Sequence, residues 1–403
     1  MKPAEPDKPH TNQPAWRALP TGIWALGIGS LFMDVSSELI HSLLPVFLVT
    51  ALGASMVTVG IIEGIAEATA AIMKVFSGAL SDYLGKRKFI MITGYALAAF
   101  TKPIFPLANS VVWVFTARFI DRMGKGIRGA PRDALIADIT PVKLRGAAYG
   151  LRQALDSVGA LLGPLLAMLA MLWFANDMRA AMWVAVVPAF IAVAVLLFYV
   201  REPGRDNTAK TTASRLAFTA VKRLSWRYWL VVLLGAVFTL ARFSEAFLVL
   251  RAQDVGLGLA FVPVVMIVMN VFYAGGAYPA GAAADRMSNR NLLLLGLVIL
   301  IVADIVLALA TAWWLALVGA ALWGLHMALT QGLLSKLVAD TAPVELRGTA
   351  FGIFNLISGG ALLLASVIAG ALWNAYGAAV TFYAGAGFAA LAALGILLRH
   401  NRH

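Results

Sequence analysis

Acidic and basic side chains recur at helical spacing inside the apolar stretches of this sequence. Asp34, Glu38 and His41, here called the first-helix triad, stand at positions i, i+4 and i+7. At about 100° per residue, they share one face of a helix. Burial disfavours a charged carboxylate whereas a cationic neighbour favours it, so such a group can take up and release a proton. We expect Asp34 or Glu38 to bind a proton, with His41 as the cationic partner.

The second apolar stretch repeats this arrangement. Glu63, Glu67 and Lys74 also share one helix face, at i, i+4 and i+11. Six further groups in the apolar stretches are candidates for the same polar site: Arg118, Arg152, Asp156, Arg242, Glu245 and His326. An ionisable group in hydrocarbon costs at least about 2.5–3.5 kcal/mol, so these side chains are expected to face a central cavity or one another. More of them precede residue 200 than follow it, which places most of the chemistry in the first half.

Other uses of these residues remain open. Arg118, Arg152 and Arg242 could bind an anionic solute. The first-helix triad could bind a divalent metal, but no second histidine stands at i+3 or i+4 of His41. The rest of the charged fourth stretch, Asp121 to Arg132, is expected to form a structural ion-pair cluster with nearby acids and loops.

These charges lie in an otherwise apolar chain. Hydrophobic residues make up 61% of it and charged residues 13%, against roughly 45–50% and about 25% in soluble domains. The apolar residues form continuous blocks, and a helix needs about 20 of them to cross a bilayer. Barrel strands would instead alternate over about 10 residues. We therefore predict an all-α membrane protein with twelve helices, at residues 21–50, 57–80, 89–108, 110–130, 148–173, 179–200, 228–250, 260–283, 291–310, 313–337, 349–373 and 377–398.

Basic residues indicate the orientation of these helices. Lysine and arginine gather in the loops on one side, at residues 86–88, 143–145, 201–227, 286–290 and 347, and at the C-terminus. The loops of the other side carry almost none, at residues 51–56, 107–110, 311–312 and 374–377. Because basic loops stay in the cytoplasm, both termini are expected on the cytoplasmic side. The expected membrane is a bacterial-type inner membrane.

The two halves of the chain repeat. Residues 137–146 read ADITPVKLRG and residues 339–348 read ADTAPVELRG, 202 positions later. Two like-oriented halves are typical of parallel-repeat transporters. The predicted division is a cytoplasmic tail, a six-helix bundle, a cytoplasmic linker, a second six-helix bundle and a cytoplasmic tail, at residues 1–20, 21–200, 201–227, 228–398 and 399–403.

The loop after the second block resembles a family signature. Residues 78–88 read GALSDYLGKRK, which is similar to the G-x-L-x-D-x-x-G-R-K motif of the major facilitator superfamily, with the two basic residues in reverse order. The resemblance covers residues 21–399 and implies two six-helix bundles related by pseudo-two-fold symmetry, with helices 1, 4, 7 and 10 around the cavity. It also implies a conformational latch between the bundles, formed by Gly78, Asp82, Gly85, Lys86 and Arg87. The second copy lacks the basic run, so a one-sided latch is expected.

A second motif lies in the fifth block. Gly159, Gly163 and Pro164 resemble the G-x-x-x-G-P core of the exporter signature of the same superfamily, although Ala167 and Met168 stand where that signature has two further glycines. Small residues four apart let helices approach closely, and proline bends a helix. The resemblance implies export.

These observations favour proton-coupled export, by antiport and alternating access, of a small molecule. The alternatives are proton symport or facilitated uptake of an anionic solute, export of a divalent metal, and a transporter-like receptor or lipid flippase. We expect no enzymatic activity, cofactor or resident metal, because no nucleotide-binding motif or nucleophile–base pair occurs. The expected partners are the substrate, protons and the bilayer. The net charge of +12 lies in membrane loops, which argues against nucleic acid, and the chain is expected to be a monomer.

Overall fold

Every regular element of the described chain is helical. The computed structural model describes residues 18–202, 224–343 and 346–398, and the side chains of Asp82, Ala284, Asp285, Gly348 and Leu398 lie outside this description. Most of both predicted tails and of the predicted linker lies outside it as well. The first half contains α1 (Thr21–Val46), α2 (Met56–Leu84), α3 (Arg87–Thr101), α4 (Ile104–Leu107), α5 (Val111–Ile139), α6 (Arg145–Trp173), α7 (Met178–Trp183) and α8 (Val186–Tyr199).

The second half follows the same order. It contains α10 (Trp226–Leu240), α11 (Ala246–Asp254), α12 (Val264–Arg286), α13 (Asn289–Leu309), α14 (Trp313–Thr341), α15 (Arg347–Tyr376) and α16 (Ala378–Leu398). Within the described residues, ten helical segments are long and apolar enough to cross a membrane. The other two predicted spans are α5, which carries many charges, and the pair α10 and α11, in which each helix is short.

Three predicted helices are interrupted. The third consists of α3 and α4, the sixth of α7 and α8, and the seventh of α10 and α11, so the prediction of one continuous helix over residues 228–250 is wrong. Pro103 lies in the break of the third helix, and its missing N–H and ring do not fit a helix interior. The fourth helix extends to Ile139, beyond the predicted end at residue 130.

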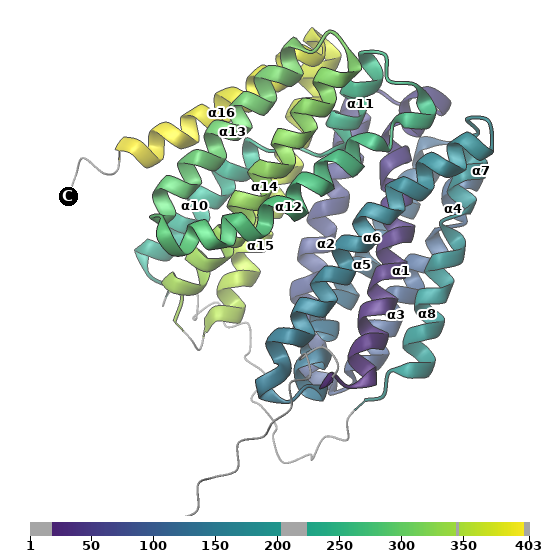
Figure 1. Ribbon diagram of the computed structural model, residues 1–403, viewed down its shortest axis with the longest axis vertical. Coiled ribbons are helices and arrows are strands. Elements are labelled where there is room, and N and C mark those ends of the chain that lie inside the picture. The colour runs from purple at the N-terminus through teal and green to yellow at the C-terminus, as the bar shows by residue number, and fades with distance from the viewer. Residues whose placement is uncertain (1–17, 203–223, 344–345, 399–403) are drawn as a thin grey trace, which may run out of the picture.

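The helices form two bundles with matching internal packing (Figure 1). In the first, α1 packs on α6 and α8, α3 packs on α5 and α8, and α2 packs on α5. In the second, α10 packs on α15 and α16, α13 packs on α14 and α16, and α12 packs on α14. The bundles meet where α2 packs on α15 and where α6 packs on α12. Exchanging the two bundles turns one of these contacts into the other, as pseudo-two-fold symmetry requires.

Glycines allow the close approach of the two bundles. A Cβ atom on Gly60 of α2 would lie 2.2 Å from the backbone oxygen of Ser366 in α15, and one on Gly370 of α15 would lie 2.4 Å from that of Met56. No side chain fits at these distances, so backbone lies directly against backbone. On the same side of the molecule α1 packs on α11. The bundles lie together at the end that carries α7 and α11 and diverge toward the opposite end (Figure 1).

Candidate functional site

His41 connects two acidic residues that belong to different helices. Its Nδ1 atom lies 3.3 Å from Glu38 Oε2 in α1, and its Nε2 atom lies 3.6 Å from Glu63 Oε2 in α2. Arg118 of α5 donates a hydrogen bond to the same Glu63 oxygen at 2.8 Å. Glu63 and Arg118 are each only 1% exposed. Four of the residues selected from the sequence therefore form one chain of acidic and basic groups.

A second chain of charges lies beside the first. Arg122 Nη1 lies 3.2 Å from Glu67 Oε1, and Arg122 Nε lies 3.9 Å from Asp121 Oδ2. Lys102 donates to Asp121 Oδ1 at 2.7 Å and to Ser37 Oγ at 3.0 Å. Lys102 is 1% exposed and ties the break of the third membrane helix to α1 and α5.

Lys102 was absent from the residues selected from the sequence. The selection relied on charges repeated at helical spacing, and Lys102 stands alone in its apolar block. A lysine directly before Pro103 inside a membrane block is the signal that could have identified it, because a break in the helix and an isolated charge coincide there.

Asp34 faces a different set of cations. Arg128 Nη2 lies 3.9 Å from Asp34 Oδ1, and the Asp34 side chain is 24% exposed. Arg152 donates to Asp156 Oδ2 at 2.5 Å and also lies 3.3 Å from Asp133 Oδ1. Asp34 is thus more loosely paired than Asp156.

Glycines of α6 place its backbone against the acidic face of α1. A Cβ atom on Gly159 would lie 2.8 Å from the Leu31 backbone oxygen and 3.0 Å from the Cβ of Asp34. One on Gly163 would lie 2.8 Å from the Cβ of Glu38. Pro164 is buried within the same helix. The motif that resembles an exporter signature therefore packs directly behind the two α1 carboxylates.

Two adjoining cavities lie between the bundles. Their volumes are about 230 Å³ and about 420 Å³, and Glu38, Glu67 and Lys125 line both. The smaller cavity is completed by His41, Glu63, Arg122, Arg242, Phe243, Ser244, Glu245, Gln331 and Leu362. The larger one includes Asp34, Lys74, Arg128, Arg132, Arg152, Asp156 and Asn355. The structure thus gathers most of the selected residues around one polar space, mainly from the first bundle, whereas Arg118 and His326 line neither cavity.

The broken seventh membrane helix supplies the wall of the second bundle. Between α10 and α11, the Ser244 N–H donates to Ser366 Oγ at 3.2 Å, and Ser244 Oγ accepts from the Ala246 N–H at 3.3 Å. Side chains thereby satisfy backbone groups that the break frees, as buried backbone inside a membrane requires. The break brings Arg242 and Glu245 to the smaller cavity.

The structure places His326 elsewhere. Its Nδ1 atom donates to the Gly296 backbone oxygen at 2.8 Å, and its ring stacks on Phe238 with 6.3 Å between centroids. His326 is 1% exposed and is not among the residues that line the two cavities. Its described contacts are those of a packed core side chain.

The loop predicted to act as a latch is fastened to its own bundle. Gly85 ends α2 with a φ of 66°, a left-handed conformation that favours glycine. Arg87 donates to the Ala134 backbone oxygen at 3.1 Å and pairs with Asp138. Lys86 precedes α3, and Gly78 faces α5. The side chain of Asp82 lies outside the described residues, so the latch remains a prediction.

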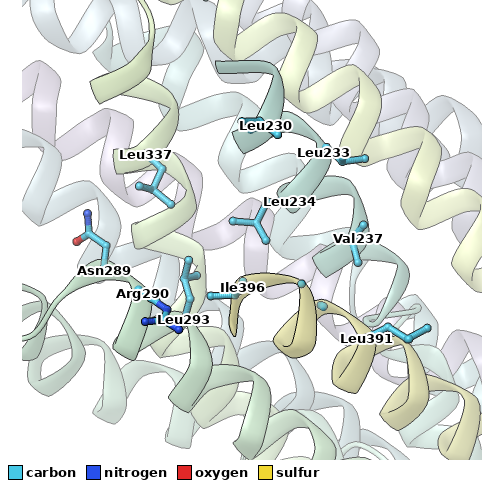
Figure 2. A pocket seen from close by; sticks show the side chains of 12 residues that line it. Leu230, Leu233, Leu234, Val237, Asn289, Arg290, Leu293, Leu337, Leu391 and Ile396 are labelled. Carbon is cyan, nitrogen blue, oxygen red and sulfur yellow. The ribbon is translucent and has the colours of Figure 1, made fainter. Parts of the chain in front are cut away.

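A separate groove lies within the second bundle. It has a volume of about 550 Å³ and runs between α10, α13, α14 and α16 (Figure 2). Six of its twelve lining residues are leucines, and Asn289 and Arg290 stand at one end. It shares no lining residue with the two central cavities and lies outside the polar site.

Comparisons of sequence agree on one family. The profile of the Major Facilitator Superfamily matches residues 26–272 and 243–403. An uncharacterised MFS-type transporter of Methanocaldococcus jannaschii is 31% identical over 364 residues, which cover 89% of this chain and 90% of that protein. The class C tetracycline resistance protein of Escherichia coli is 26% identical over 326 residues, covering 74% and 77% of the two chains.

Solved structures share the fold. The nucleoside transporter NupG has a TM-score of 0.78 at 14% identity and covers 93% of this chain and 99% of that one. A bacterial homologue of the human lysosomal transporter Spinster, inward-facing and occupied, has a TM-score of 0.75 at 16% identity and covers 97% and 98%. Two six-helix bundles, as predicted from the sequence, are thereby confirmed.

Proposed function

Because this chain belongs to the major facilitator superfamily, we propose that it is a secondary transporter that exports a polar small molecule in exchange for protons. The observation that carries this proposal is the chain of groups from Glu38 through His41 to Glu63 and Arg118. It joins a carboxylate at the cavity to a fully buried ion pair on other helices. A change in the protonation of Glu38 or Asp34 therefore alters the forces between α1, α2 and α5.

Asp34 is the first choice for the carboxyl group that exchanges the proton. Its nearest basic group, Arg128, lies 3.9 Å away, whereas Glu38 has His41 at 3.3 Å. Asp34 and Asp156 also line the same cavity, so like charges there favour protonation of one of them. Glu38 and His41 connect that event to the buried pairs.

The lining of the smaller cavity supports a polar substrate. Of its twelve lining residues, only Phe243 and Leu362 are apolar. Charges of both signs are present, because the first bundle supplies Glu67 and Lys125 and the second supplies Arg242 and Glu245. A zwitterionic or singly charged molecule with separated polar groups matches this lining better than a flat apolar compound does.

Two further observations support export. The glycines of the exporter-like motif pack against the α1 backbone at Asp34 and Glu38, and two relatives are tetracycline resistance proteins, of class C and class H. The class H protein of Pasteurella multocida is 25% identical over 305 residues, covering 69% of this chain and 71% of that protein. Resistance to a compound is consistent with its removal from the cell.

Uptake of an anionic solute is the second candidate. Arg242 lines the smaller cavity beside Arg122 and Lys125, which gives this proposal its support. Two arginines selected for that role are already paired, however. Arg118 is held by Glu63 at 2.8 Å and Arg152 by Asp156 at 2.5 Å. Less positive charge is therefore left for a substrate anion.

Vesicle orientation separates the two candidates. Inverted and right-side-out membrane vesicles with an imposed pH gradient are given tetracycline and a panel of zwitterionic, cationic and anionic metabolites, and a pH-sensitive dye records compound-dependent proton movement. Export predicts accumulation of a zwitterion or cation in acid-inside inverted vesicles, with release of their protons. Accumulation of an anion in right-side-out vesicles would establish uptake instead.

A further inference from the structure

One buried acid of the second bundle takes no part in the site described above. Asp304 lies within α13 and is 0% exposed. Neither of its carboxyl oxygens has a hydrogen-bond partner within the described part of the chain. An unpaired ionised carboxylate is very costly in a low-dielectric interior, and such a group becomes neutral instead. This environment therefore favours the neutral, protonated form of Asp304.

Gly385 and the Phe243 ring lie beside the Asp304 carboxyl group. A Cβ atom on Gly385 of α16 would lie 2.7 Å from Asp304 Oδ2 and 3.1 Å from Phe243 Cε1. The missing side chain of Gly385 thus leaves the space that the carboxyl group occupies, next to the Phe243 ring. That ring packs on Trp323 and Phe382, with 5.4 Å and 5.5 Å between centroids.

Charged groups on the surrounding helices are engaged elsewhere. On α14, His326 hydrogen-bonds a backbone oxygen, and on α11, Arg251 pairs with Asp254. Arg242 and Glu245, in the break, line the central cavity. Helix α16 carries no acidic or basic residue. The other charged residues of α12, α13 and α14 lie near the helix ends on the side of the basic loops: Asp285, Arg286, Arg290, Lys336 and Asp340.

Phe243 links the surroundings of Asp304 to the central cavity. It belongs to the broken segment between α10 and α11, and it lines the smaller cavity together with its neighbours Arg242 and Ser244. The same side chain therefore borders both the cavity and the surroundings of the carboxyl group. A movement of this segment, which lacks regular helical hydrogen bonds, would open Asp304 to cavity water.

We propose that Asp304 is a proton-binding site of the second bundle, loaded in this conformation and emptied when the broken segment moves Phe243 aside. On emptying, the carboxyl O–H bond breaks and the proton passes to water in the cavity. On loading, a proton returns from water to the carboxylate. The use of this site in transport rests on the proposed function, the exchange of substrate for protons. The binding of a proton by Asp304 is independent of that function.

Infrared spectroscopy of the protein in liposomes tests the loading without any substrate. A protonated carboxyl group gives a C=O stretching band that a carboxylate lacks. The difference spectrum between the wild type and Asp304→Asn at neutral pH should contain this band. Asp254→Asn is the matched control, because Asp254 is 48% exposed and paired with Arg251, and its difference spectrum should show carboxylate bands. Carboxylate bands for Asp304 as well would overturn the proposal.

A pair of glycines on α16 tests the described surroundings. Gly385→Ala places a methyl group against the carboxyl oxygen and should shift or remove the C=O band. Gly387→Ala lies two residues away on the same helix with no atom within 4 Å of its Cβ position, so the band should stay unchanged. Equal spectra for the two variants would mean that the carboxyl group does not lie where the structure has it.

Spin-label distances test the emptying. The chain has no cysteine, so Val142→Cys and Trp226→Cys can be labelled selectively, one in each bundle and on the side of the basic loops. Both positions are well exposed, at 75% and 74%. Raising the pH should shift the wild-type distance distribution, and Asp304→Asn should remove that shift. An unchanged shift in Asp304→Asn would overturn the emptying, and neither readout depends on the α1 carboxylates being the site of exchange.

Discussion

Each buried charged residue of α5 has a partner of opposite sign. Arg118 and Arg122 face Glu63 and Glu67 of α2, and Asp121 faces Lys102. Removing one member of a buried pair leaves the other charge uncompensated, which is strongly destabilising. The site is therefore a set of matched ion pairs. Substitutions at some of these residues should affect stability, and substitutions at others should affect function.

Lys102 should be essential for stability. Lys102→Met leaves Asp121 buried with only Arg122 at 3.9 Å, and we expect a loss of about 3–5 kcal/mol. The measurement is thermal denaturation of the purified protein in detergent. The double variant Lys102→Met with Asp121→Leu removes both charges and should recover most of the loss. Equal stability of the single variant and the wild type would show that this pair is not structural.

Asp34 should control coupling and not stability. Asp34→Asn keeps the size of a side chain that is only loosely paired with Arg128. With the compound identified in vesicles, pH-gradient-driven flux should fall to background while counterflow exchange persists. Asp254→Asn, at a position that lines neither cavity, serves as the control. Full gradient-driven flux in Asp34→Asn, Glu38→Gln and their double variant would exclude the α1 carboxylates as the coupling site.

Helical spacing predicted the site only where charges repeat on one element. Glu38 and His41 share a helix face in the sequence and meet Glu63 in space, whereas Asp34 pairs with Arg128 and Glu67 with Arg122. Which cation pairs with which acid depends on helices far apart in the chain, so the partners Arg118 and Arg122 could not be assigned. Lys102 and His326 show the limit: a single charge in an apolar block can face the polar network or the core.

Helix packing fixes the position of α1 and therefore the position of its acidic residues. The glycines of α6 bring its backbone within contact of α1, so the position of α1 is fixed by backbone atoms and not by adaptable side chains. Apolar blocks predicted the helices because bilayer thickness dictates their length. The break in the seventh helix was not predictable from hydropathy, because Arg242 to Glu245 interrupt its block without a proline, whereas Pro103 marks the break in the third.

The close approach of α6 to α1 gives a test at the scale of the element. Gly163→Ala places a Cβ atom 2.7 Å from the Val35 backbone oxygen, so α6 must move away from α1. We expect a loss of roughly 1–3 kcal/mol in stability and reduced transport. Gly150→Ala in the same helix, with no atom within 4 Å of the new Cβ, is the control. If both variants behave alike in thermal denaturation and flux, the contact does not position the α1 carboxylates.

In the whole molecule, the packing of the helices follows the pseudo-two-fold symmetry, but the distribution of charged residues does not. The two bundles repeat their packing, yet the first supplies most of the charges around the cavities. The sequence repeat predicted the shared architecture, because the same loop segment recurs at the same place in each half and so indicates two halves with the same orientation. The unequal distribution of charge was also visible in the sequence.

Orientation in the membrane is testable because the chain has no cysteine. Ser110→Cys, in a loop without basic residues, should react with a membrane-impermeant maleimide added to intact cells. Val142→Cys, 75% exposed beside the basic loops, should react only after the cells are opened. Tags on both termini should be protected from external protease. Labelling of Val142→Cys in intact cells would reverse the assignment.

The contact between α2 and α15 has a consequence for the speed of rocking. Where α2 meets α15, Gly60 and Gly370 lie against backbone, so at these two points the surfaces can pivot without displacing a side chain. Where α6 meets α12, Asn270 donates a hydrogen bond to the Ala160 backbone oxygen, and rocking must also exchange partners among the charges of α1, α2 and α5. The turnover rate should therefore depend more steeply on ionic strength and pH than on membrane viscosity.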